Sequence, residues 1–142
     1  MTVDTKLLLK KAFAARDHAY APYSGMKVGA ALLCTDNSIE LGCNIENAAW
    51  SPSLCAERVA LSLAVSKGKL NFAAIAIIGG PAGKTAPYDE YFWPCGVCRQ
   101  ALAEFCDDDF IIIAAKSMED YVSHTLVELL PERFSPRFLQ GP

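Results

Sequence analysis

Three cysteines and a glutamate stand at spacings that suit a metal site with one open position. Cys55 and Glu57 are two residues apart, Cys95 directly follows Pro94, and Cys98 stands three residues after Cys95. Thiolates bind zinc well, and a zinc ion with three protein ligands keeps water in its fourth position, as catalytic sites do. Zinc makes hydroxide available near neutral pH, and Glu57 can carry the proton that is released. The sequence therefore predicts a hydrolytic zinc site with Cys55, Cys95 and Cys98 as ligands.

Breaks in the sequence before these residues indicate how they can meet. In the middle of a helix, positions i and i+2 point to nearly opposite sides, because each residue turns the chain by about 100°. Cys55 and Glu57 can therefore share one site only at the start of a helix, and Pro52 marks a break before them. Pro94, a favoured helix opener, precedes the second cysteine pair. We expect two helix N-termini to converge on the metal ion, where their dipoles offset the charge of the thiolates.

Two arginines stand beside these residues in the sequence. Arg58 directly follows the glutamate, and Arg99 directly follows the last cysteine. A guanidinium group can donate charged hydrogen bonds to a thiolate and so withdraw negative charge from the metal site. We predict that both arginines support the thiolates from outside; the alternative is that one or both only cover the surface.

The remaining cysteines leave other interpretations open. A closed structural site would need a fourth ligand, for which Cys34 and Cys43 are the candidates. Both stand in strand-like runs, where a thiol behaves as a small apolar residue, and a closed site would leave Glu57 without a role. Three disulfides from the six cysteines are disfavoured, because cytosolic thiols stay reduced and a chain of 142 residues does not need them. His18 and His124 have no place in the predicted site.

The elements that must position the site alternate along the chain. The apolar spacing and the breakers indicate helices, strands and loops in an order that predicts a mixed sheet with helices packed on it. We expect one domain over residues 1–142. The expected elements are a helix over 4–19, a hairpin of strands over 27–34 and 39–44, a helix over 55–67, a strand over 72–78, a loop over 79–93, a helix over 96–106, a strand over 110–115 and a wrapping tail over 129–142.

Composition excludes several classes of protein. Hydrophobic residues make up 52% of the chain and charged residues 20%, which predicts either a large core or surface that other subunits cover. The net charge is −3 without a basic stripe, which argues against a nucleic-acid partner. No apolar run is long enough to span a membrane. The polar start of the sequence lacks a signal segment, which predicts a cytoplasmic protein.

Beyond these motifs, the sequence resembles the zinc-dependent cytidine deaminases, specifically the short-chain type with three cysteine ligands. The resemblance extends from about residue 23 to 134 and implies an α/β fold of three layers, α/β/α, with a mixed five-stranded sheet and helices on both faces. It also implies one zinc ion per subunit. The segments that match are residues 28–32, 42–48, 55–58, 94–100 and 128–131, together with Phe134.

The resemblance implies roles for residues away from the metal. Asn44 and Glu46 would hydrogen-bond the ribose hydroxyls, since a carboxylate accepts and an amide both donates and accepts. The backbone of Ala56 and the carboxylate of Glu57 would bind the polar edge of the pyrimidine. Phe134 would press on the base from a neighbouring subunit, because family members are typically homotetramers with shared active sites.

The chain departs from the family pattern at three places. Met26 stands where the family usually has a phenylalanine beside the base, and a thioether replaces part of that contact. Trp50 stands where a tyrosine often reaches into the adjacent subunit's site. The loop over 79–93 is longer than usual, and its aromatic residues would line the site or a subunit contact; they are Tyr88, Tyr91, Phe92 and Trp93.

The reaction that the resemblance implies is hydrolytic, so the protein would be a hydrolase. Cytidine or 2′-deoxycytidine and water would give uridine or 2′-deoxyuridine and ammonia, in pyrimidine salvage. Zinc-activated hydroxide would attack C4, with Glu57 as the proton shuttle. The alternative substrate is a modified cytosine nucleoside such as blasticidin S, which Met26 and Trp50 leave open, although residues 44–47 favour an ordinary ribose. A non-catalytic zinc-binding protein and a polynucleotide editor are two further alternatives; Glu57 argues against the first and the acidic balance against the second.

Overall fold

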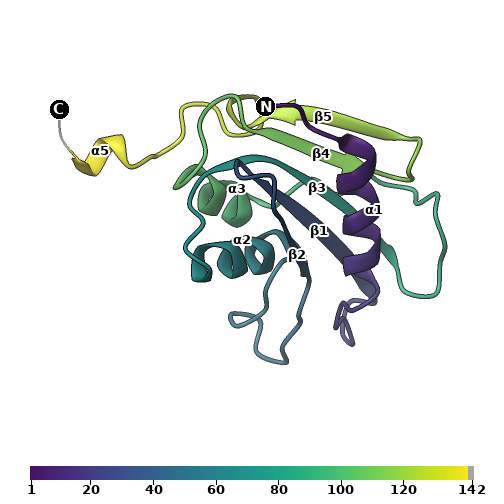
Figure 1. Cartoon of the computed structure of the whole chain (residues 1–142). Coiled ribbons are helices and arrows are strands. Elements are labelled where there is room, and N and C mark those ends of the chain that lie inside the picture. Colours follow the sequence, from purple (N-terminus) through teal and green to yellow (C-terminus); the bar gives the residue numbers. More distant parts are fainter. Residues whose placement is uncertain (141–142) are drawn as a thin grey trace.

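The computed structural model describes residues 1–140, which form a five-stranded sheet with helices against it (Figure 1). The strand order is β2-β1-β3-β4-β5. Strands β3 and β4 are parallel and the other neighbours are antiparallel, so the sheet is mixed, as predicted. The strands are β1 (Met26–Cys34), β2 (Ile39–Cys43), β3 (Phe72–Pro81), β4 (Ile111–Ala115) and β5 (Tyr121–Thr125).

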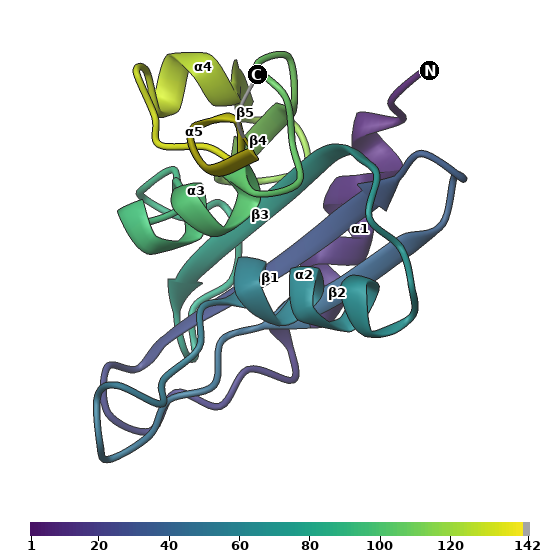
Figure 2. The ribbon, with the colours of Figure 1, turned by 90° about the vertical axis from the view of Figure 1, so that its left-hand side faces the viewer.

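Helices cover both faces of this sheet, which confirms the expected three layers. Figure 2 shows α2 and α3 in front of the sheet and α1 behind it. Within residues 1–140, none of the helices combines the length and apolar character that crossing a membrane requires. The helices are α1 (Thr5–Arg16), α2 (Ala56–Ser66), α3 (Gly96–Ala103), α4 (Leu126–Leu129) and α5 (Arg137–Gln140).

The core consists of two hydrophobic clusters, one on each face of the sheet. Ala31 and Leu33 of β1 belong to the cluster under α1, whereas Ala30 and Leu32 belong to the cluster under α2 and α3. Successive side chains of a strand point to opposite faces. A strand that is covered on both faces is therefore apolar throughout, as the run over Phe72–Pro81 is.

A glycine sets the height of α2 above the sheet. A Cβ atom on Gly42 of β2 would lie 2.3 Å from the carbonyl oxygen of Ala56 and 2.5 Å from the nitrogen of Ala60. The first turns of α2 therefore rest directly on the backbone of β2. This contact fixes the end of the helix at which the predicted metal site begins.

The central strand is longer than expected. β3 continues to Pro81, whereas we expected a loop from residue 79. Gly79 and Gly80 look like loop residues in the sequence, but both pair with β1. The side chains of Tyr88 and Phe92 lie over these two glycines, where a Cβ atom would meet the rings at 2.2 Å and 2.4 Å. The glycines therefore make room for aromatic rings within a strand.

The aromatic residues of the following loop pack largely against their own chain. Tyr88 is buried and stacks on Phe13. The ring of Trp93 lies 4.9 Å from the ring of His124, and the Tyr91 hydroxyl donates to Asp120. These contacts hold the loop on the sheet.

The segment after β4 forms elements that the sequence patterns did not indicate. β5 is an edge strand whose first three residues are exposed, so it lacks the apolar alternation that marks a strand. α4 follows directly, and a capping box between Thr125 and Glu128 caps its N-terminus. The expected tail over 129–142 therefore begins at the end of a helix, and its last two residues lie outside the described range.

Candidate active site

The sulfur atoms of the three predicted ligands lie together. Those of Cys55, Cys95 and Cys98 are all within 4.8 Å of one another. Cys95 Sγ is 3.8 Å from Cys55 Sγ and 3.6 Å from Cys98 Sγ. A tetrahedral zinc ion with Zn–S bonds of about 2.3 Å separates its sulfur ligands by about 3.8 Å. The donor set and its spacing therefore fit zinc.

Two helix N-termini bring the sulfurs to this point. Cys55 is the N-cap of α2 and Cys95 is the N-cap of α3, both with extended backbone, and Cys98 lies in the first turn of α3. This is the convergence that the breaks at Pro52 and Pro94 predict. The first N–H groups of each helix lack intrahelical acceptors and point toward negative charge. Three thiolates at this place are thus partly compensated by backbone.

Glu57 lies in the first turn of α2 beside these sulfurs and is only 5% exposed. Burial raises the pKa of Glu57 to about 7, and the negative charge of Cys55 adds to this effect. The N–H of Glu57 itself and the thiol of Cys98 act in the opposite direction on the same pKa. A carboxyl group whose pKa is near neutrality can both accept and return a proton, which general acid–base catalysis requires.

The thiols influence one another strongly. Hydrogen bonding from Cys98 lowers the pKa of Cys55 to about 5; Arg58 and Cys95 add to this effect and burial opposes it. The pKa of Cys98 is raised, because its thiol donates to Cys55 and is buried close to Glu57. A divalent cation deprotonates the thiols that coordinate it. The cluster therefore holds one ready thiolate and two further sulfurs for such an ion.

The two predicted supporting arginines differ in their partners. Arg58 Nη2 lies 3.8 Å from Cys55 Sγ and 3.4 Å from the carbonyl oxygen of Ser53. Arg99 donates instead to the carbonyls of Pro94 and Leu129, both at 2.7 Å, and so ties the start of α3 to α4. The contact of Arg58 agrees with its predicted role, whereas an action of Arg99 on the thiolates stays a prediction.

Asn44 and Glu46 follow β2 and lie next to the segment that leads into α2. The residue between them, Ile45, exchanges two backbone hydrogen bonds with Leu54 at 2.9 Å and 2.8 Å. Leu54 directly precedes Cys55. This pairing places the two predicted sugar-binding residues beside the metal cluster, although they are far from Cys95 and Cys98 in the sequence.

Asn44 is anchored to the start of β1, and Glu46 to the turn that precedes it. Asn44 Nδ2 donates to the carbonyl of Met26, and Asn44 Oδ1 accepts from the N–H of Val28, both at 2.8 Å. Glu46 Oε1 accepts from two backbone N–H groups, and its other oxygen accepts from the hydroxyl of Ser24. The sequence patterns gave no role to Ser24, which stands in the segment that breaks the first helix. The signal that could have indicated a role is a hydroxyl residue next to a glycine in a turn.

The other residues predicted at the site differ in their exposure. Ala56 begins α2 and is fully buried, and Met26 begins β1. Phe134 is 55% exposed after α4, where its ring stacks on Phe138 at 5.3 Å between centroids. Trp50 is 79% exposed on the loop between β2 and α2. The aromatic residues thus face outward, whereas Ala56 lies within the chain.

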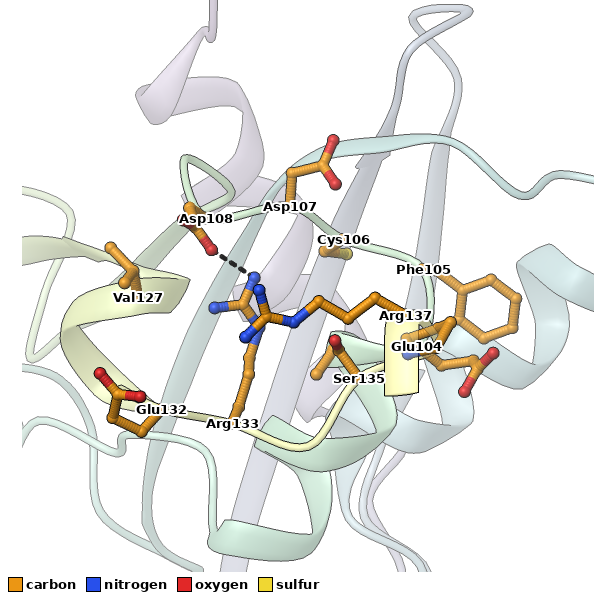
Figure 3. Close-up of a pocket in the computed structure, with 12 residues that line it drawn as sticks. Glu104, Phe105, Cys106, Asp107, Asp108, Val127, Glu132, Arg133, Ser135 and Arg137 are labelled. Carbon is orange, nitrogen blue, oxygen red and sulfur yellow. Dashed lines mark hydrogen bonds and ion pairs between the residues drawn. The ribbon is translucent and has the colours of Figure 1, made fainter. Parts of the chain in front are cut away.

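Two hollows in the described part of the surface lie away from this cluster. A hollow of about 450 Å³ lies between the C-terminal end of α3 and the tail, and an ion pair of Arg133 and Asp108 crosses it (Figure 3). The thiols lie at the opposite end of α3. A second hollow, of about 340 Å³, lies near Phe72 and Phe110. None of the predicted site residues lines either of the two.

Comparison with known proteins relates this arrangement to one family. The family of the cytidine and deoxycytidylate deaminase zinc-binding region matches residues 2–114. A cytidine deaminase of Sporosarcina psychrophila is 41% identical over 133 residues, which cover 94% of this chain and 93% of the relative. A blasticidin-S deaminase of Bacillus cereus is 28% identical over 109 residues, which are 76% of each chain.

A solved structure agrees with these sequence matches. The crystal structure of cytidine deaminase from Burkholderia pseudomallei superimposes with a TM-score of 0.80 at 39% identity, covering 94% of this chain and 100% of that one. The predicted fold class and the zinc cofactor are thereby confirmed. This chain belongs to the cytidine and deoxycytidylate deaminase zinc-binding family.

Proposed function

We propose that this protein hydrolyses cytidine and 2′-deoxycytidine to uridine and 2′-deoxyuridine with release of ammonia. The observation on which this depends is the cluster of three sulfurs within 4.8 Å, with the buried Glu57 beside it at a helix N-terminus. The similarity to proteins named cytidine deaminase supports the choice of substrate.

The cysteines and Glu57 have different roles in the proposed reaction. Cys55, Cys95 and Cys98 hold zinc, which, when bound, supplies a Lewis acid that lowers the pKa of water. Glu57 accepts a proton from the attacking water, passes it to the ring nitrogen and later protonates the departing amine. Oxygen first adds to C4, and the C–N bond then breaks as the proton of the new C4 hydroxyl passes through Glu57 to the departing amine. Arg58 withdraws charge from the sulfur of Cys55, and we assign Arg99 the same task.

The remaining predicted residues hold the nucleoside. Asn44 and Glu46 bind the ribose hydroxyls, each with hydrogen-bonding capacity that its partners within the chain leave over. The N–H of Ala56, as the first residue of α2, has no acceptor within its helix and serves the pyrimidine edge. Met26 lies beside the base and packs on it with its thioether.

We further propose that the protein is a homotetramer with shared active sites. Phe134 and Trp50 are exposed aromatic residues, and the tail toward α5 leaves the body of the chain (Figure 1). A neighbouring subunit that inserts Phe134 over the base would cover apolar surface and close the site. Sedimentation at micromolar concentration tests the tetramer, and Phe134→Ala should raise KM without lowering zinc content.

We also propose one domain over residues 1–142, a cytoplasmic location and a role in pyrimidine salvage.

The substrate assignment has a direct test. Purified protein is incubated with cytidine, 2′-deoxycytidine and blasticidin S, and deamination is followed by loss of ultraviolet absorbance. We expect turnover of the first two substrates; no turnover of either would refute the proposal. Preferential turnover of blasticidin S would favour the alternative that the more distant relative represents.

A further inference from the structure

The carboxylate of Glu46 is held by one turn of the chain. Its Oε1 accepts from the N–H groups of Tyr23 and Ser24, both at 3.0 Å, and its Oε2 accepts from the Ser24 hydroxyl at 2.5 Å. The hydrogen bond from the Ser24 hydroxyl is the largest cause that lowers the pKa of Glu46. Because donors reach both oxygens, the plane of the carboxylate is fixed.

The hydroxyl of Ser24 also has a second partner. It accepts from the N–H of Met26 at 3.0 Å, and the carbonyl of Met26 accepts from Asn44 Nδ2 at 2.8 Å. A continuous hydrogen-bonded path thus runs from Glu46 through Ser24 and the main chain of Met26 to Asn44. Asn44 is fixed from its other side by the N–H of Val28.

Each end of this path keeps capacity for a ligand. A carboxylate has about four lone-pair sites, and the hydrogen bonds from Tyr23 and Ser24 use three of those of Glu46. Asn44 keeps one N–H and one lone pair beyond its bonds to Met26 and Val28. Two neighbouring sugar hydroxyls need an acceptor and an amide at a fixed mutual orientation, and the path provides that orientation.

We propose that Ser24 is a positioning residue for sugar recognition, which orients Glu46 directly and Asn44 through the main chain of Met26. The inference rests on the proposed function, because it concerns how the same site recognises its nucleoside. Binding energy from the remote sugar contributes to catalysis at the base only when the contacts are held in place.

Loss of the hydroxyl should therefore weaken recognition of the sugar specifically. Removal of a hydrogen bond to a charged group typically changes an equilibrium by roughly tenfold or more. We expect Ser24→Ala to raise KM for cytidine roughly tenfold, with a smaller change in kcat. A purely structural role would instead lower turnover of all substrates alike.

The experiment compares cytidine with 2′,3′-dideoxycytidine, which lacks the 2′- and 3′-hydroxyls of the ribose. The measured quantity is the ratio of kcat/KM for the two substrates in the wild type and in Ser24→Ala. We expect the ratio of cytidine to 2′,3′-dideoxycytidine to be at least threefold lower in Ser24→Ala than in the wild type. The variant binds the sugar hydroxyls less well, so their absence from the substrate costs it less. An unchanged ratio would overturn the inference while leaving the function intact; no turnover of cytidine by the wild type would refute the function itself.

Matched variants complete the design. Ser38 makes the same kind of contact elsewhere, with its hydroxyl 2.5 Å from Asp36 Oδ1, so Ser38→Ala should leave the ratio unchanged. Ser24→Thr keeps the hydroxyl and should retain the wild-type ratio. Valine has the shape of threonine but no hydroxyl, so Ser24→Val should resemble Ser24→Ala. This pair decides the question even if Ser24→Ala does not fold, and equal ratios for Thr and Val would overturn the inference.

Discussion

A buried carboxylate lies at each end of helix α2, Glu57 in its first turn and Glu40 of β2 beside its last residues. Both residues are 5% exposed, yet their pKa values move in opposite directions. Burial raises the pKa of Glu57 to about 7. Burial also acts to raise the pKa of Glu40, but hydrogen bonds from Lys67 and Lys69 outweigh it, so that the pKa is lowered.

The difference lies in the partners and in the depth, because Glu57 lies deeper within the chain than Glu40. Glu40 lies 3.0 Å from Lys67 Nζ and 3.3 Å from Lys69 Nζ, so its charge is compensated within the chain. Glu57 lies beside the sulfur cluster, and the positive charge of Arg58 lowers its pKa by less than burial raises it. A compensated carboxylate stabilises the fold, whereas one whose pKa lies near neutrality can exchange protons with a ligand. We therefore expect helix α2 to have a catalytic end at Glu57 and a structural end at Glu40.

Substitution of the two glutamates gives the largest contrast. Glu57→Gln removes the proton carrier and should lower kcat for cytidine by about 10²–10⁴-fold, the usual contribution of general acid–base catalysis. Glu40→Gln should leave kcat within about twofold, because Glu40 lies away from the reacting atoms and their surroundings do not change. Steady-state assays of both variants at pH 7 measure this. Equal losses in the two variants would mean that α2 has no catalytic end.

Removal of a sulfur gives a second contrast. Cys98 and Cys106 are both buried cysteines, but only Cys98 belongs to the cluster. Cys98→Ala should lose most of its bound zinc and its turnover, because two sulfurs do not hold the ion firmly. Cys106→Ala should keep both, with a small loss of stability from the cavity. Metal analysis of the purified variants decides this, and zinc loss in Cys106→Ala would contradict the ligand assignment.

Close contact of helix and strand gives a third contrast, between the two faces of the sheet. A Cβ on Gly29 would lie 2.0 Å from the Ala12 carbonyl oxygen under α1, much as Gly42 does under α2. Gly29→Ala and Gly42→Ala should each cost about 1–3 kcal/mol of unfolding free energy through overpacking. Only Gly42→Ala should also lower turnover per folded molecule, because it displaces the start of α2. Urea denaturation measures the loss of unfolding free energy. Turnover divided by the amount of bound zinc measures the activity of each folded molecule.

The smallest effect concerns the structural end and depends on pH. Because the pKa of Glu40 is lowered in the folded state, its charge stabilises the fold above the unfolded pKa, and this contribution is lost as the pH falls through the folded pKa. Glu40→Gln should therefore cost about 1 kcal/mol at pH 7 and less at pH 3. Urea denaturation at the two pH values measures the difference. A cost that is constant with pH would mean that the pairing with the lysines is unimportant.

The metal end of the site was predictable from the sequence because local signals determine it. Pro52 and Pro94 mark breaks at which helices begin, and Cys55 and Cys95 stand at the resulting N-caps. Neighbouring residues thus specify which atoms face the ion. The contact of Arg58 with the cluster follows from the same proximity in sequence.

The sugar end was not predictable in this way, because long-range hydrogen bonds assemble it. Asn44 and Glu46 were assigned by resemblance alone, and their anchoring depends on residues about 20 positions earlier, among them Ser24. The extension of β3 over Gly79 and the exposed strand β5 were missed for a related reason. Pairing with neighbouring strands decides both, and it overrides the local preference of each segment.

We expect the sulfur cluster and Glu57 to form one zinc-dependent deaminase site. Zinc is removed by a chelator and added back in steps, while bound zinc and cytidine turnover are measured on the same samples of wild type and Glu57→Gln. We predict that wild-type turnover disappears with the metal and returns in proportion to zinc until one ion is bound per chain, whereas Glu57→Gln binds zinc equally but stays inactive. Turnover that persists without zinc, or full turnover in zinc-loaded Glu57→Gln, would contradict the account.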